Sequence, residues 1–136
     1  GLSADLHAFA GRADVIVNTL PLTADTKHLF GKAFFDAAKR GALFISVGRG
    51  ASVVTDDLIA ALADGRIGGA GLDVTDPEPL PADHPLWRAP NVLITPHILA
   101  TTDLGEEPRW LIARENLRRF AAGGKLLSEV DVGRGY

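Results

Sequence analysis

The 136-residue sequence lacks several features that mark particular classes of protein. It contains no cysteine, which excludes a disulfide framework and thiol chemistry and leaves the redox compartment open. Its 14 basic residues are outnumbered by 17 acidic ones, and the net charge of -3 gives no electrostatic case for nucleic acid or an anionic membrane surface. No apolar run approaches the roughly 20 residues of a membrane span. We therefore expect neither nucleic acid nor a membrane as a partner.

The remaining composition is that of one ordinary globular domain. Apolar runs of strand length alternate with segments of helical periodicity along the chain. We expect strands at residues 14–20, 42–47, 68–74 and 91–95, and helices at residues 3–11, 32–39, 55–63 and from 107 to about 123. This alternation predicts right-handed βαβ units and a parallel sheet, so the fold class is α/β. The proline-rich stretch 77–90 is expected to be a long loop.

Some side chains have predicted positions in these elements. The β-branched run Val15–Val17 is consecutive, which favours a parallel strand buried on both faces. In the first helix, Leu6, Phe9 and Ala10 are expected to face inward, and in the second helix Phe34, Phe35 and Ala38 are expected to do so. Thr55 is expected to cap the third helix.

Three ionisable residues occur where packing alone would not require them. Arg49 lies in Gly48-Arg49-Gly50 after an apolar run, Glu78 lies between two prolines, and His97 follows Thr95-Pro96 after another apolar run. A cation, an acid and an imidazole at the ends of successive strands could bind a carboxylate and move a proton. Taken one at a time, each more often has a structural role: Arg49 as a solvated loop residue, Glu78 as a rigid loop acid and His97 as the end of a strand.

Several short motifs run through nearly the whole chain in a fixed order. Together they resemble the C-terminal part of a D-2-hydroxyacid dehydrogenase: Leu20–Thr23 with Thr26, Gly48–Gly50, Gly71–Val74, Pro77–Pro81, His84–Trp87 and Thr95–His97. The ending Val130–Tyr136 and the Pro79–Pro81 segment are similar to the glyoxylate/hydroxypyruvate reductase branch. The resemblance implies a partial, C-terminal half of a Rossmann-type doubly wound parallel sheet.

The resemblance assigns roles to the three ionisable residues. It implies that Arg49 holds the substrate carboxylate and that His97 is the general acid and base. Histidine suits this role because its ordinary pKa of about 6.5 lies near working pH. Glu78 would then accept a hydrogen bond from the other ring nitrogen and fix the tautomer. His84 is expected to pack its loop rather than perform chemistry.

The resemblance also implies a set of contacts to a nicotinamide dinucleotide. Leu20, Pro21 and Thr26 would line its ribose and adenine side, and Val47 and Gly48 would approach the nicotinamide ribose. The absence of a Cβ would permit that close approach at Gly48. Asp73 would bind the nicotinamide amide. Two alternatives stay open from the residues themselves: Asp73 could be a turn acid that closes a strand, and Thr23 and Thr26 could be hydroxyls that cap the following helix.

The chain does not contain the G-x-G-x-x-G turn that opens a dinucleotide-binding domain. Gly48-x-Gly50 is followed by Val53 where a third glycine is needed, and Gly69-x-Gly71 is followed by Val74. We therefore interpret residues 1–136 as the C-terminal portion of such a domain, without the substrate domain. The residue that distinguishes NAD from NADP is not in the chain, and the resemblance favours NADPH.

Two function classes remain. The first is an oxidoreductase that transfers a hydride from NAD(P)H to a small 2-oxo acid such as glyoxylate or hydroxypyruvate, cytoplasmic and homodimeric, with these 136 residues inactive alone. The second is a truncated, non-catalytic relative that serves as an interaction or oligomerisation module. An upstream G-x-G-x-x-G would decide for the first class.

Overall fold

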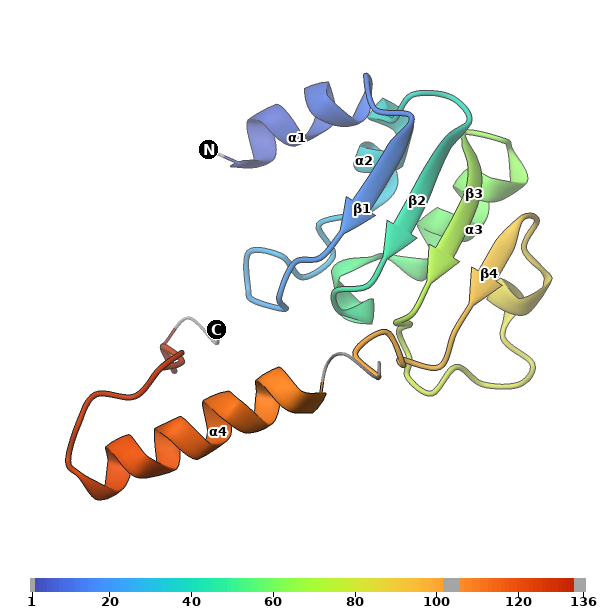
Figure 1. Ribbon diagram of the computed structural model, residues 1–136. Helices are drawn as coiled ribbons and strands as arrows, with labels where there is room; N and C mark the ends of the chain where they lie inside the picture. The colour runs from blue at the N-terminus through green and yellow to red at the C-terminus, as the bar shows by residue number, and fades with distance from the viewer. Residues whose placement is uncertain (1, 102–105, 134–136) are drawn as a thin grey trace. The chain divides into compact units, whose positions relative to one another are not determined.

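The first compact unit of the protein is built on a parallel β-sheet. The computed structural model describes residues 2–101 and 106–133, which divide into the units Gly1–His97 and Ile98–Tyr136. The first unit contains four parallel strands in the order β1-β2-β3-β4 (Figure 1): β1 Val15–Asn18, β2 Ala42–Ser46, β3 Ile67–Leu72 and β4 Val92–Ile94. The partial Rossmann-type α/β fold is therefore confirmed, and its strand ends differ from the expected ones by only a residue or two.

Helices connect the strands and cover one face of this sheet. Helix α1 (Leu2–Ala10) precedes β1, α2 (Lys32–Ala37) links β1 to β2, and α3 (Thr55–Ala63) links β2 to β3. In Figure 1, α2 and α3 both lie behind the sheet. The expected loop between β3 and β4 is present and includes one short 3₁₀ helix, η2 (Pro85–Arg88).

The core lies between that helical layer and the sheet. Four phenylalanine rings meet there with neighbouring centroids 4.9–6.1 Å apart: Phe30, Phe34, Phe35 and Phe44. All four are buried, as are Leu58 and Leu62 of α3. The predicted inward positions of Phe34, Phe35 and Ala38 are therefore confirmed.

The opposite face of the sheet is exposed and apolar, which corrects the prediction for the first strand. Of its three β-branched residues only Ile16 is buried, at 5% exposure, whereas Val15 and Val17 are 50% and 56% exposed. Successive strand side chains point to opposite faces, and α2 and α3 cover the Ile16 face only. The pairing of the strands places Leu43 of β2 and Leu93 of β4 on the same face as Val15 and Val17, and both leucines are exposed. No helix among the described residues of the first unit covers it.

Two further predictions were wrong. Phe9 is 63% exposed, because α1 contributes Ala10 and Leu6 to the core and directs Phe9 away from it. Thr55 does not cap α3 but is its first residue. Its hydroxyl donates instead to the carbonyl oxygen of Asp76 at 2.9 Å, which ties the start of α3 to the loop that carries Glu78.

The second unit contains helix α4 (Glu106–Ala121), which was expected to begin near residue 107. It ends as predicted near Gly123, whose φ of 66° is the left-handed conformation that favours glycine. Hydrogen bonds from Arg118 and Arg119 lower the pKa of Glu115 on this helix to about 2. Residues Arg134–Tyr136 of the family-like ending lie outside the described residues. None of the helices described is long and apolar enough to cross a membrane.

Candidate active site

The carboxyl ends of the parallel strands bring the candidate residues to one edge of the sheet. Val47 follows β2 directly, Asp73 follows β3, and His97 lies just after β4. Backbone hydrogen bonds of 2.9 Å continue past the ends of the strands. The N–H groups of Val47, Asp73 and Thr95 donate to the carbonyl oxygens of Asn18, Ser46 and Leu72, respectively. Ligands of open α/β sheets bind in the crevice at this edge.

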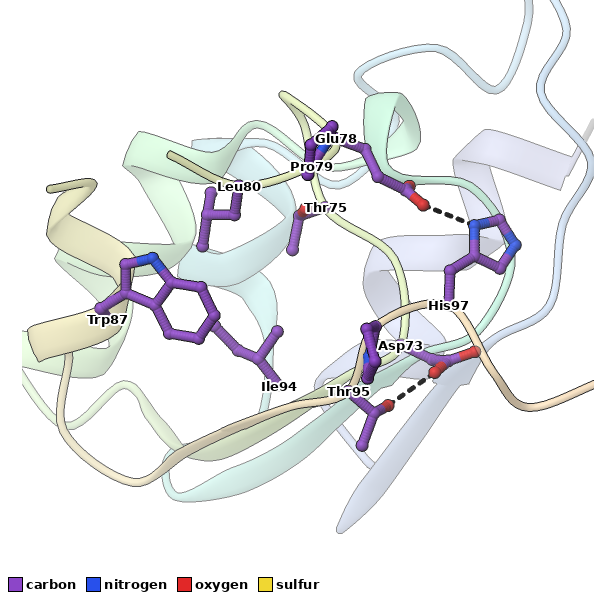
Figure 2. A pocket seen from close by; sticks show the side chains of 10 residues that line it. Asp73, Thr75, Glu78, Pro79, Leu80, Trp87, Ile94, Thr95 and His97 are labelled. Atoms are coloured by element: carbon purple, nitrogen blue, oxygen red, sulfur yellow. Dashed lines mark hydrogen bonds and ion pairs between the residues drawn. The ribbon is translucent and has the colours of Figure 1, made fainter. Parts of the chain in front are cut away.

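Glu78 and His97 form a direct pair. The Nδ1 atom of His97 lies 2.6 Å from Oε1 of Glu78, as Figure 2 shows. The side chains are 45% and 39% exposed, so the pair is open to a reactant. An Nδ1–H that donates to the carboxylate selects one tautomer and leaves Nε2 for proton transfer. The contact predicted between these two residues is therefore present.

The backbone of His97 has an uncommon conformation. Its φ is 54°, a region that residues other than glycine seldom adopt. The His97 N–H donates to the carbonyl oxygen of Thr95 at 3.0 Å, which closes a tight turn directly after β4. Such conformations are maintained by the surrounding structure and concentrate at functional sites.

Arg49 lies in a turn that passes between two other backbone segments. A Cβ added to Gly48 would lie 2.5 Å from the carbonyl oxygen of Leu20, and one added to Gly50 would overlap that of Thr75. Both glycines are therefore required by contacts within the protein. The space that a Cβ of Gly48 would fill lies against the backbone of Thr19 and Leu20, and the approach of a cofactor to Gly48 stays a prediction. The exposed Arg49 guanidinium donates to the carbonyl oxygen of Gly48 at 2.7 Å.

We expect Gly50→Ala to destabilise the folded protein by about 1–3 kcal/mol or more, because the new methyl group must displace the Thr75 backbone. The midpoint of denaturant unfolding measures this loss. Gly71→Ala is the matched control, since its Cβ would meet only the mobile end of the Ile45 side chain at 3.1 Å. Equal midpoints for the two variants would contradict the close passage of the turn.

A cavity of about 630 Å³ lies beside the Glu78–His97 pair. Asp73, Glu78 and His97 line one end of it, and Leu80, Trp87 and Ile94 line the other (Figure 2). The buried Asp73 accepts a hydrogen bond from the Thr95 hydroxyl at 2.6 Å. Asp73 therefore has the structural role of an acid at the end of β3, and it also lines the cavity.

The loop of Leu20, Pro21 and Thr26 runs next to the Arg49 turn. The Thr26 hydroxyl donates to the carbonyl oxygen of Pro21 at 2.6 Å and accepts from the N–H of Thr23 at 2.8 Å. This hydroxyl therefore shapes its own loop. It does not cap α2, whose N-cap is Gly31. The cofactor contacts predicted for Leu20, Pro21 and Thr26 stay predictions.

His84 has the structural role expected of it. Its Nδ1 accepts from the N–H of Leu86 at 3.2 Å, at the start of η2. Sequence reasoning missed one group at this edge, the buried polar side chains of Asn18, Ser46 and Ser52. The available signal was an asparagine at the end of a strand made of β-branched residues.

The chain matches a protein-family model and several solved structures. Residues 2–98 match the model of the D-isomer specific 2-hydroxyacid dehydrogenase NAD-binding domain. The structure is similar to a D-isomer specific 2-hydroxyacid dehydrogenase of Xanthobacter autotrophicus Py2 in complex with NADPH and MES (TM-score 0.87, 43% identity, 98% of this chain and 54% of that one). It is also similar to the NADPH-dependent glyoxylate/hydroxypyruvate reductase of Sinorhizobium meliloti in complex with NADP and sulfate (TM-score 0.87, 39% identity, 98% and 43%).

A curated relative is also similar along the chain. The "Uncharacterized protein in proB 3'region" of Corynebacterium melassecola is 45% identical over 130 residues, which are 96% of this chain and 42% of that protein. The chain thus spans roughly half or less of the length of these relatives. The matches agree with the parallel sheet and its flanking helices. The chain belongs to the D-isomer specific 2-hydroxyacid dehydrogenase family and contains sequence of its NAD-binding domain.

Proposed function

We propose that the protein to which this chain belongs reduces a small 2-oxo acid, such as glyoxylate or hydroxypyruvate, with NAD(P)H. The chain would be the C-terminal portion of its dinucleotide-binding domain. The observation that carries the proposal is the 2.6 Å contact between His97 and Glu78, at the same sheet edge as the Arg49 turn. The family match and the similarity to a glyoxylate/hydroxypyruvate reductase support it.

The residues at this edge fit the nicotinamide end of such a cofactor. The Asp73 carboxylate, buried at the end of β3, is an acceptor for a carboxamide N–H. Val47 and Gly48 would lie along the nicotinamide ribose, and Leu20, Pro21 and Thr26 along the ribose and adenine side. The sequence contains no G-x-G-x-x-G turn for the pyrophosphate. NADPH is favoured because both of the similar structures described above contain NADPH or NADP.

During reduction of a 2-oxo acid, negative charge develops on the carbonyl oxygen, and the proposed roles follow from this. A dinucleotide held by Val47, Gly48 and Asp73 would be the source of the hydride that the carbonyl carbon of the 2-oxo acid receives. Arg49 binds the substrate carboxylate with its planar donors and stabilises the negative charge that grows on the carbonyl oxygen. His97 delivers a proton from Nε2 to that oxygen, which completes the 2-hydroxy acid. Glu78 holds the ring through Nδ1 and fixes its tautomer and orientation.

The proposal is tested by following the absorbance of NADPH and NADH with glyoxylate, hydroxypyruvate and pyruvate as substrates. The purified protein that contains this chain together with any upstream domain is the material to use. We expect oxidation of NADPH that depends on glyoxylate or hydroxypyruvate. Binding of the cofactor without turnover of any 2-oxo acid would contradict the proposal.

The second candidate function is an interaction or oligomerisation module. It is favoured by the exposed apolar face formed by Val15, Val17, Leu43 and Leu93, and by the position of β1 at the edge of the sheet. An edge strand with apolar side chains is a template for association. In this reading the 136 residues alone are inactive as a reductase, bind NAD(P)H weakly and pair with a second copy. Cytoplasmic location stays a prediction.

We expect the isolated chain to sediment as a dimer or larger species, because parallel sheets are normally covered on both faces. A double variant, Val17→Thr with Leu93→Thr, keeps side chains suited to strands but reduces the apolar area of the exposed face. It should shift sedimentation towards the monomer. Phe9→Gln, on the exposed side of α1, is the control and should leave association unchanged. A monomeric wild-type chain that binds NADPH tightly would refute both expectations.

A further inference from the structure

A buried polar cluster lies beneath the Arg49 turn. Asn18, at the end of β1, is 1% exposed, and its Nδ2 donates to the hydroxyls of Ser46 at 3.0 Å and Ser52 at 2.8 Å. Its Oδ1 accepts from the N–H of Leu20 at 3.1 Å. One amide group at the end of β1 is thus joined to the end of β2 and to the turn that follows it, 28 and 34 positions away.

Ser52 extends this cluster to the backbone of Arg49. Its hydroxyl donates to the carbonyl oxygen of Arg49 at 2.7 Å, and its N–H donates to the same oxygen at 3.1 Å. Because that hydroxyl already accepts from Asn18, its proton is directed at Arg49. The chain of donors therefore runs in one direction, from Asn18 through Ser52 to Arg49.

Buried polar groups are costly unless their hydrogen bonds are satisfied. Here they are satisfied, since every buried side-chain nitrogen and oxygen among the described residues has a partner. A valine would meet the packing needs of a strand such as Val15–Asn18 without this requirement. The hydrogen bonds from Asn18 instead hold together the Leu20 segment and the turn that carries Arg49.

We propose that Asn18 and Ser52 are positioning residues that orient Arg49 towards the substrate carboxylate. Neither side chain touches the reactants, and both act through the Arg49 backbone. The inference rests on the proposed role of Arg49 in binding a 2-oxo acid. Loss of the Ser52 hydroxyl should remove one of the two hydrogen bonds from Ser52 to the Arg49 carbonyl oxygen, whereas loss of the Ser46 hydroxyl should leave both in place.

Ser52→Ala and Ser46→Ala form a matched pair for the test. Each removes one buried hydroxyl that accepts from Asn18, but only Ser52 contacts Arg49. The first measurement is amide hydrogen exchange of the isolated chain at residue 52 and Val53, whose N–H groups bond to Arg49 and Gly50. We expect exchange about five- to tenfold faster in Ser52→Ala than in Ser46→Ala, the effect of one ordinary hydrogen bond.

The second measurement is the steady-state kinetics of the protein with its upstream part. Ser52→Ala should raise KM for the 2-oxo acid by about five- to tenfold, and Ser46→Ala should change it little. In an Arg49→Ala background the additional effect of Ser52→Ala should vanish. If Ser52→Ala does not fold, Ser52→Cys keeps the size of the side chain with a weaker donor and replaces it.

Equal effects of the two serine substitutions on exchange and on KM would overturn the positioning role and leave a purely structural cluster. A different result bears on the proposed function: if Arg49→Ala leaves KM and kcat unchanged, Arg49 does not bind the substrate. The exchange measurement would then still report whether Ser52 holds the turn. The failures of the two proposals are therefore distinguishable.

Discussion

Replacement of His97 by alanine is expected to reduce turnover of the 2-oxo acid by about 10²–10⁴-fold, the usual loss when a general acid is removed. Cofactor affinity should stay nearly unchanged, because the proposed cofactor contacts lie on the loops after β1, β2 and β3. Stopped-flow measurement of a single turnover, together with an NADPH titration, separates the two quantities.

A second variant separates chemistry from backbone strain at this position. His97 has a φ of 54°, which alanine adopts at a cost and asparagine tolerates better. His97→Asn should therefore be as inactive as His97→Ala but more stable. His28→Asn is the control, because His28 has a φ of 55° in an exposed loop and is not the histidine that pairs with Glu78. If either His97 variant kept near-full activity, another residue would have to supply the proton.

Replacement of Arg49 by alanine is expected to lower kcat/KM for the 2-oxo acid by about 10²–10³-fold, the loss typical of removing a donor to developing negative charge. KM should rise as well, because the substrate carboxylate loses its cation. Arg49→Lys should recover only part of the loss, since an ammonium group retains the charge without the planar pair of donors. Initial-rate kinetics over a range of substrate concentrations measure both parameters.

Arg40→Ala is a suitable control for this experiment. Arg40 lies before β2 whereas Arg49 lies after it, and its guanidinium also donates to a backbone carbonyl, that of Asp64 at 2.9 Å. The two arginines therefore flank opposite ends of one strand. A similar decrease in kcat/KM for both substitutions would indicate a general effect on stability rather than binding of the substrate by Arg49.

The sequence predicted the elements of this fold because their signals are local. A run such as Val15–Val17, or the apolar spacing of Phe34, Phe35 and Ala38, reports strand or helix from residues only a few positions apart. The order of these elements then restricts the topology to a parallel sheet. The same order predicted that Arg49, Glu78 and His97 meet at one edge, because Arg49 and His97 each follow the carboxyl end of a strand.

Side-chain exposure was predicted less well, because it depends on which elements cover a surface. Val15 and Val17 have the composition of a strand buried on both faces, yet α2 and α3 cover only one face. Phe9 has helical spacing, yet α1 directs it away from the core. Thr55 matched a capping pattern, but the nearby carbonyl of Asp76 accepts its hydroxyl instead. These outcomes depend on residues distant in sequence.

The sequence alone thus determined the alternation of strands and helices, the family and the residue types available for proton transfer and carboxylate binding. Tertiary structure alone decided that Asn18 bonds to Ser46 and Ser52, 28 and 34 positions away, and that Gly50 must pass the backbone of Thr75. The physical reason is register. Which side chains meet across parallel strands and their loops depends on how those strands align, and no short stretch of sequence encodes that alignment.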